Sequence, residues 1–327
     1  MIAQGRRINY LRISITDRCN FRCRYCMTGA PFPQLSHNEV ARYEEILTIT
    51  RLACELGITK VRITGGEPFA RKGIFSFLER LSQIPGLGET TITTNGALLD
   101  RQTLKRLRDL GIKRLNFSLD ALEPDLFSAI TRTDAFDRVW QNICTAHELG
   151  MAPVKINAVI LAGINDSQIE ALAGLTLDRP FHVRFIEYMP MGTRGDNPIQ
   201  PVLAPDIRKA VEDRFGPLEP ETQNINDGPA KKFRISGAKG IVGFITPVSS
   251  HFCAQCNRLR LTARGTLRPC LLDNRETDIL GPLRNHAGDS ALKEIILDCV
   301  HNKPDRHHLA DRKKTDIPIS HMTSIGG

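Results

Sequence analysis

The chain has 327 residues, of which 41% are hydrophobic and 24% charged, a composition typical of a soluble globular protein of roughly two domains. No apolar run approaches the roughly 18 residues of a membrane-spanning helix, and the N-terminal segment resembles neither a signal peptide nor a transit peptide, so we expect a cytoplasmic protein without membrane contact. The formal net charge of +8 is compatible with nucleic-acid binding, but the distribution of that charge argues against it.

Positive charge is concentrated in two short segments, each of which also contains three cysteines. Residues 1–26 contain six Arg against one Asp, and residues 251–275 contain five Arg against one Asp. Arginines grouped beside thiols favour a small polyanion bound next to a metal site over a long stripe that follows nucleic-acid phosphates. The odd total of nine cysteines, in a reducing compartment, indicates metal ligands or buried thiols in place of disulfides.

From residue 8 to about residue 189, short β-branched runs alternate with helical periodicity, which is typical of βα units on a parallel sheet. The predicted strands are Ile8–Thr16, Lys60–Thr64, Thr90–Thr94, Arg114–Asp120, Val154–Ile160 and His182–Met189. The predicted helices include Asn38–Leu56, with Ser36 as N-cap and Gly57 at its end, and Asp134–Leu149, followed by Gly150. A full eight-stranded barrel takes about 250 residues, so these six units indicate a partial barrel or an open sheet, with ligands beyond the carboxyl ends of the strands.

The composition changes after Met189. Residues 190–205 are rich in Gly and Pro and predict a loop, followed by a helix near Asp206–Phe215 and a hairpin across Lys232–Ile245. We therefore predict a barrel domain over residues 1–190 and a smaller C-terminal domain over residues 191–327, whose cysteines complete the site. The tail from about Asn302 is predicted to be flexible.

The first cysteine triplet is Cys19, Cys23 and Cys26, with C-x-x-x-C-x-x-C spacing just after the first predicted strand. A structural zinc site needs four ligands, and no fourth Cys or His lies within ten residues. Three thiolates on a cluster of four irons leave one iron free to bind a cofactor. The alternatives are a zinc ion completed by a distant residue, or chance clustering.

The second triplet is Cys253, Cys256 and Cys270, to which His251 could add a fourth zinc ligand. Arg258 and Arg260 alternate just after Cys256, so both can lie on one face of an extended segment and form an anion or nucleobase pocket; the alternative is a solvated strand face. The remaining cysteines lack ligand spacing and are predicted to be core thiols: Cys54, Cys144 and Cys299.

The first triplet, with Tyr25 before its third cysteine, resembles the motif of the radical S-adenosylmethionine (SAM) superfamily, and Gly65-Gly66-Glu67-Pro68 resembles that superfamily's GGEP segment. Both triplets, this segment and the Gly326-Gly327 end together resemble the GTP 3',8-cyclase family of molybdenum cofactor biosynthesis. The likeness covers nearly the whole chain and is weakest across residues 190–235. Thr28 departs from the Pro that the family often has there.

The resemblance implies an α/β fold, a partial (βα)6 TIM-like barrel closed by the C-terminal domain. It implies that Cys19, Cys23 and Cys26 hold a 4Fe-4S cluster that binds SAM, and that Cys253, Cys256 and Cys270 hold a second 4Fe-4S cluster that meets guanine. The implied SAM contacts are Tyr25, Gly66, Ser118 and Met189. The implied GTP contacts are Arg12, Arg62, Thr93, Lys155, Arg184, Arg258, Leu259 and Arg260. The tail of Gly326 and Gly327 is expected to reach into the active site.

The family reaction begins when a 5'-deoxyadenosyl radical removes the ribose 3'-hydrogen of GTP. The carbon radical then attacks C8, giving (8S)-3',8-cyclo-7,8-dihydroguanosine 5'-triphosphate, the first step of molybdenum cofactor biosynthesis. The implied partners are a reductant or electron-transfer protein and cyclic pyranopterin monophosphate synthase, with a homodimer as one assembly. Two other hypotheses remain: a different radical SAM enzyme with an auxiliary cluster, for example a peptide-modifying one, and a zinc-containing RNA-binding protein. The second is disfavoured because stacking aromatics make up only 6% of the chain.

Overall fold

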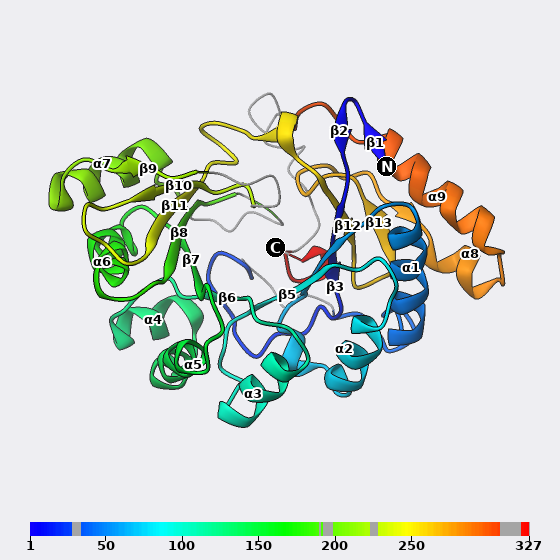
Figure 1. The fold of residues 1–327 in the computed structure, drawn as a ribbon, viewed down its shortest axis with the longest axis horizontal. Helices are drawn as coiled ribbons and strands as arrows, with labels where there is room; N and C mark the ends of the chain where they lie inside the picture. Colours follow the sequence, from blue (N-terminus) through cyan, green and yellow to red (C-terminus); the bar gives the residue numbers. More distant parts are fainter. Residues whose placement is uncertain (28–33, 190, 192–198, 223–227, 308–321, 327) are drawn as a thin grey trace.

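One large curved sheet organises the computed structural model, which describes residues 1–27, 34–189, 191, 199–222, 228–307 and 322–326. Its twelve strands follow the order β14-β13-β12-β3-β4-β5-β6-β7-β8-β11-β10-β9, and helices cover its convex face (Figure 1). The central strands are β3 (Tyr10–Ser14), β4 (Lys60–Thr64), β5 (Glu89–Thr94), β6 (Leu115–Ser118), β7 (Lys155–Ile160) and β8 (His182–Glu187). Each pairs with the next in parallel, which confirms the predicted partial barrel of six βα units.

Segments from the C-terminal part of the chain extend both edges of this barrel. On one side β11 (Ile241–Ile245) pairs in parallel with β8 and continues into β10 (Lys231–Arg234) and β9 (Glu219–Pro220). On the other side β12 (Arg258–Leu261) pairs in parallel with β3 and continues into β13 (Thr266–Arg268) and β14 (Thr277–Asp278). The hairpin predicted across Lys232–Ile245 is confirmed. The sheet is continuous from β8 to β11, that is, across the predicted domain boundary near residue 190. This boundary therefore stays a prediction.

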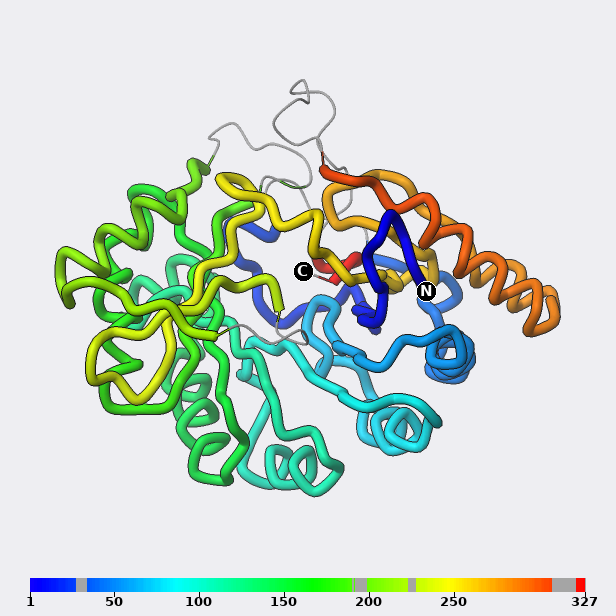
Figure 2. Tube along the Cα trace, turned by 45° about the horizontal axis from the view of Figure 1, so that its top comes forward, coloured from blue at the N-terminus to red at the C-terminus, as the bar shows by residue number. Residues whose placement is uncertain are grey.

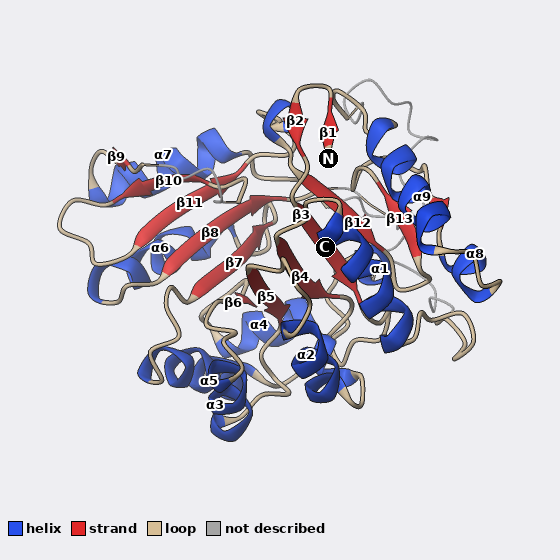
Figure 3. Cartoon of the chain, turned by 45° about the vertical axis from the view of Figure 1, so that its right-hand side comes forward, coloured by secondary structure: helices blue, strands red, loops and turns tan. Residues whose placement is uncertain are grey.

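Alternation along each strand separates the apolar core from the interior of the barrel. In β3, for example, Leu11 and Ile13 are fully buried in the hydrophobic core, whereas Tyr10 and Arg12 line the interior. The helices over the barrel strands are α1 (Tyr43–Glu55), α2 (Ile74–Ser82), α3 (Arg101–Asp109), α4 (Pro124–Thr131), α5 (Phe136–Glu148), α6 (Ile169–Asp178) and α7 (Ala204–Phe215). The helices α8 (Leu280–Arg284) and α9 (Asp289–His301) lie beside α1 and the β12–β13 edge (Figure 3).

The first helix begins later than the sequence predicts. Residues 37–39 form a turn, and the Ser36 amide before it donates to the Glu39 carboxylate at 3.0 Å. The helix starts at Tyr43 because the Arg42 amide donates to the Glu45 carboxylate at 2.6 Å, which satisfies a backbone group at the helix entrance. The predicted start at Asn38, with Ser36 as N-cap, is therefore wrong.

The described part of the segment from Asn302 contacts the rest of the protein, and the predicted flexibility of the tail stays a prediction. Lys303 is buried, and its ammonium group donates to the Arg258 carbonyl at 2.8 Å and to the Pro269 carbonyl. The short helix α10 (Met322–Ile325) lies inside the barrel, near the centre of Figure 2, where its Thr323 carbonyl accepts from Ser14 at 3.3 Å. Residues 308–321 and Gly327 lie outside the described residues. Among the described residues, no helix is long and apolar enough to cross a membrane.

The approach of β11 to the sheet depends on Gly240. A Cβ atom at this position would lie 2.3 Å from the Phe181 carbonyl oxygen, a backbone atom that cannot move aside cheaply. We expect Gly240→Ala to lower the free energy of unfolding by about 2 kcal/mol or more, measured by urea denaturation. The control Gly288→Ala, where a Cβ meets nothing within 4 Å but Ala replaces the N-cap of α9, should lower it by less than about 1 kcal/mol. Equal decreases in the free energy of unfolding of the two variants would contradict this role of Gly240.

Candidate active site

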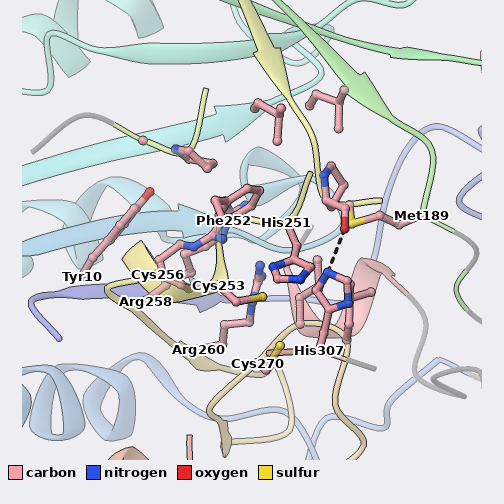
Figure 4. A pocket seen from close by; sticks show the side chains of 18 of the residues that line it. Tyr10, Met189, His251, Phe252, Cys253, Cys256, Arg258, Arg260, Cys270 and His307 are labelled. Carbon is pink, nitrogen blue, oxygen red and sulfur yellow. Dashed lines mark hydrogen bonds between the residues drawn. The ribbon is translucent and has the colours of Figure 1, made fainter. Parts of the chain in front are cut away.

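Two cavities meet inside the barrel, and each contains one cysteine triplet. We call them the first lobe, lined by Cys19, Cys23 and Cys26, and the second lobe, lined by Cys253, Cys256 and Cys270. Both cavities share one wall, made of Thr93, Asn157, Ile186 and Met189. Molecules bound in the two lobes would therefore contact the same four residues. Figure 4 shows the second lobe, with its cysteines and arginines around the same space.

Two glycines allow the first cysteine loop to cross the end of β4. The Gly66 amide donates to the Thr16 carbonyl at 2.8 Å, and the Glu67 amide donates to the Arg18 carbonyl at 2.8 Å. A Cβ atom on Gly65 would lie 2.4 Å from the Thr16 carbonyl oxygen, and one on Gly66 would lie 2.3 Å from that of Arg18. The GGEP segment therefore fixes the cysteine loop by direct backbone pairing, which only residues without side chains permit.

Two buried carboxylates hold the strand ends around this loop. Glu67 is fully buried and accepts from the Thr94 hydroxyl at 2.8 Å and the Asn95 amide at 2.7 Å, which ties the end of β4 to the end of β5. Burial raises the pKa of Glu67 to about 7. Asp120 accepts from the Tyr25 hydroxyl at 2.7 Å and so ties the cysteine loop to the end of β6.

The thiols of the first triplet are in a setting that favours their neutral form. Burial, with smaller contributions from neighbouring negative groups, raises the pKa of Cys19 to about 11 and that of Cys26 to about 12. Burial also raises the pKa of Cys23 well above its ordinary value, helped by Cys26 and Asp120. These thiols become good ligands only when a positively charged metal group compensates the burial, so the donor set fits an iron-sulfur cluster.

The second triplet has a more positive environment. Cys253 begins the short 3-10 turn η3 (Cys253–Gln255) that leads into β12, Cys256 follows this turn, and Cys270 follows β13. Burial by itself would raise the pKa of Cys256, but the charges of Arg258 and Lys303 outweigh burial and lower it to about 6. Arg258 and Lys303 therefore favour the thiolate form of Cys256. Burial raises the pKa of Cys253.

The barrel interior is crowded with cations. The basic side chains that face it from successive strands are Arg12, Lys60, Arg62, Lys155, Arg184, Arg258 and Arg260. Burial, together with repulsion from neighbouring cations, lowers the pKa of Arg12 to about 9 and that of Lys155 to about 6. Glu89 neutralises part of this positive charge through its 2.8 Å ion pair with Lys60. The positive charge of the interior favours the binding of a ligand with several negative charges.

The structure brings most of the predicted binding residues together. The residues predicted to contact SAM all line the first lobe: Tyr25, Gly66, Ser118 and Met189. Those predicted to contact GTP that line the second lobe are Arg12, Arg62, Thr93, Arg184, Arg258 and Arg260. Lys155 is buried beside Arg184 in the adjacent strand, and the Leu259 side chain faces the hydrophobic core. Leu259 can therefore contact a ligand in the lobe only through its backbone.

The tail reaches the same interior. The Gly326 carbonyl accepts from the Arg260 guanidinium, and a Cβ atom on Gly326 would lie 2.5 Å from the Thr64 methyl group. With φ at +72°, this position favours glycine on conformational grounds as well. Gly327 lies outside the described residues. Cys54 and Cys299 are buried as predicted, whereas Cys144 is only half-buried.

Sequence reasoning missed several polar residues of the site. Tyr10 and Asn157 line the second lobe, and Asp120 lines the first. The signal for Tyr10 was available, because it lies two residues before Arg12 in the same strand and so faces the same side. Among the described residues, no group of three His, Cys, Asp or Glu side chains is close enough to hold a single metal ion.

Comparisons with known proteins identify the family. Residues 13–176 match the Radical SAM superfamily, and residues 181–309 match the family described as Molybdenum Cofactor Synthesis C. The GTP 3',8-cyclase of Pelotomaculum thermopropionicum is 46% identical, and that of Moorella thermoacetica 47% identical, each over 98% of this chain and 98% of its own length.

Solved structures resemble the chain at lower identity. Streptococcus suis SuiB bound to S-adenosylmethionine aligns with a TM-score of 0.63 and 18% identity, over 96% of this chain and 76% of that chain. The anSMEcpe structure with bound AdoMet aligns with a TM-score of 0.59 and 14% identity, over 92% and 82%. At these identities the likeness supports the fold alone. The curated relatives, which match over nearly their full length, show that the chain belongs to the radical SAM superfamily and, within it, to the GTP 3',8-cyclase family.

Proposed function

We propose that this chain is a lyase that converts GTP into (8S)-3',8-cyclo-7,8-dihydroguanosine 5'-triphosphate, the first step of molybdenum cofactor biosynthesis. The observation that carries the proposal is one strongly basic interior with a cysteine triplet on each side of it and a shared wall between the two lobes. Full-length relatives named for this activity support it. The likeness to SuiB, a structure of which holds a precursor peptide, is at the level of the fold and does not favour a peptide substrate.

The residues of the first lobe fit a cluster that binds SAM. Cys19, Cys23 and Cys26 supply three thiolates for a 4Fe-4S cluster, which leaves one iron for the cofactor. The chemistry that this cluster and SAM supply when bound is a 5'-deoxyadenosyl radical, which removes the ribose 3'-hydrogen. Tyr25, Gly66, Ser118 and Met189 then form the walls that orient SAM.

The residues of the second lobe fit a nucleoside triphosphate beside a second cluster. Cys253, Cys256 and Cys270 would supply the thiolates that hold a second 4Fe-4S cluster, and that cluster would provide a site for the guanine base. The interior guanidinium groups and Lys155 neutralise the triphosphate, with forks that match phosphate oxygens. No protein base is needed to remove a hydrogen atom, so the chain acts by positioning GTP against the shared wall and by excluding water.

The cellular setting that we propose follows from this chemistry. A one-electron reductant or electron-transfer protein supplies the electron that cleaves SAM and the electron that, with a proton, converts the cyclised radical into the product. Cyclic pyranopterin monophosphate synthase then receives this product. A reducing cytoplasm suits an enzyme that depends on free thiols. A homodimer is one assembly that a measurement of mass in solution would reveal.

The central experiment is anaerobic incubation of the iron-loaded chain with GTP, SAM and dithionite, followed by mass analysis of the nucleotide. We expect 5'-deoxyadenosine together with a cyclised triphosphate of the same mass as GTP but different retention. Cleavage of SAM with GTP unchanged, and a modified peptide in a parallel incubation, would reject the cyclase in favour of the peptide-modifying alternative.

The second cluster can be tested by counting iron. We expect about eight iron per reconstituted chain, because each triplet holds one cluster of four. Replacement of Cys253, Cys256 and Cys270 by Ala should remove about half of that iron and abolish cyclisation, while SAM cleavage continues at the first lobe. The control Cys54→Ala should retain all of the iron. Full iron content in the triple variant, or stoichiometric zinc in the unsubstituted chain, would rule out the second cluster.

Lys155 gives the affinity for GTP a pH dependence. Its pKa is about 6 in the ligand-free site, chiefly because of burial, and a bound triphosphate should move it back towards its ordinary value. Binding then takes up a proton above pH 6, so affinity falls as pH rises, by up to about tenfold per pH unit between pH 7.5 and 9. Equilibrium dialysis should show this slope in the unsubstituted chain and in Lys105→Met, an exposed control, and lose it in Lys155→Met. A slope that persists in Lys155→Met would assign the proton to another group.

A further inference from the structure

The second lobe contains a tyrosine whose buried hydroxyl group has no partner. Tyr10 is 4% exposed and lines the lobe, and its hydroxyl group accepts and donates no hydrogen bond among the described residues. A buried hydroxyl without a partner costs free energy, and in a ligand-binding cavity a ligand can supply that partner. In Figure 4 Tyr10 lies along one side of the lobe, next to Arg258 of the neighbouring strand β12.

The surroundings of Tyr10 are positive on several sides. The strand register sets it beside Lys60 on β4 and Arg258 on β12, while Arg12 follows it on the same face of β3. The Lys60 ammonium lies 5.3 Å, and the Arg62 guanidinium 5.6 Å, from the centre of its ring. These cations hold the ring in place, and they would attract an anion to the same spot.

The charge of these neighbours also makes the hydroxyl a stronger donor. Burial by itself would raise the pKa of Tyr10, but Arg62, Arg12, Lys60 and Arg258 together lower it. A phenol with a lowered pKa gives its proton more readily to a hydrogen bond, and a negatively charged oxygen is the best acceptor.

We propose that Tyr10 is a further substrate-binding residue, whose hydroxyl group donates a hydrogen bond to a phosphate oxygen of the nucleoside triphosphate. This inference rests on the proposed function, because it takes GTP to be the ligand of the second lobe. The Tyr10 hydroxyl group is an uncharged hydrogen-bond donor among the cations. Its hydrogen bond would therefore orient a phosphate oxygen, whereas the cations mainly attract it by charge.

The test compares Tyr10→Phe with Tyr43→Phe in the iron-loaded chain. Tyr43 is a matched control, because its hydroxyl group is likewise buried without a partner and an arginine, Arg71, lies 4.0 Å from its ring centre, but it belongs to α1 outside both lobes. Equilibrium binding of GTP and of guanosine, without SAM, is measured for each. We expect Tyr10→Phe to bind GTP 10- to 100-fold more weakly, as for a hydrogen bond to a charged group, and guanosine within about twofold.

A structural role would give different results. The phenylalanine variant should melt no lower than the unsubstituted chain, since it removes an unpaired hydroxyl and keeps the ring. Unchanged affinity for GTP, or equal weakening for GTP and guanosine, would overturn the assignment of Tyr10 to the phosphates. If the unsubstituted chain itself binds no GTP, the proposed function fails, an outcome distinct from failure of Tyr10→Phe alone.

Discussion

Repulsion among the basic side chains inside the barrel is the constraint on which the site depends. Like charges repel one another strongly where water is excluded, and here burial, together with this repulsion, lowers the pKa of Arg12, Lys155 and Arg260. The apolar layer between the sheet and its helices holds these side chains in place against that repulsion. A bound polyanion relieves the repulsion, so part of the binding free energy of a triphosphate is already stored in the fold.

The two cysteine triplets differ in the charge around them, and this difference follows from the strands that carry them. The first triplet lies among Glu67, Asp120 and its own thiols, all of which oppose a thiolate. The second leads into β12, which brings Arg258 beside Cys256. One fold thus places a cysteine loop near carboxylates and a cysteine loop near cations on two sides of a single space.

Sequence patterns predicted the parts of this site that local spacing encodes. The cysteine triplets, the glycine pair and the alternation of Arg258 with Arg260 are all visible within a few residues, and the parallel strands follow from β-branched runs between helices. The pairing of β12 with β3 could not be predicted, because no local pattern records which strand lies next to which. The burial of Lys303 could not be predicted for the same reason, because it depends on the distant Arg258 and Pro269 carbonyls. The start of α1 was missed because a side chain, Glu45, sets it.

The pairing of β3 with β12 also bears on how the protein is made. It joins residues about 250 positions apart, such as Arg12 and Arg260, and contacts of such long range form late because a long loop must first be closed. During synthesis on the ribosome, β3 and the first cysteine loop exist long before the strand that completes their side of the barrel. An incomplete chain therefore has the loop that would start radical chemistry but lacks the wall that would confine it. Only the finished protein encloses the reaction.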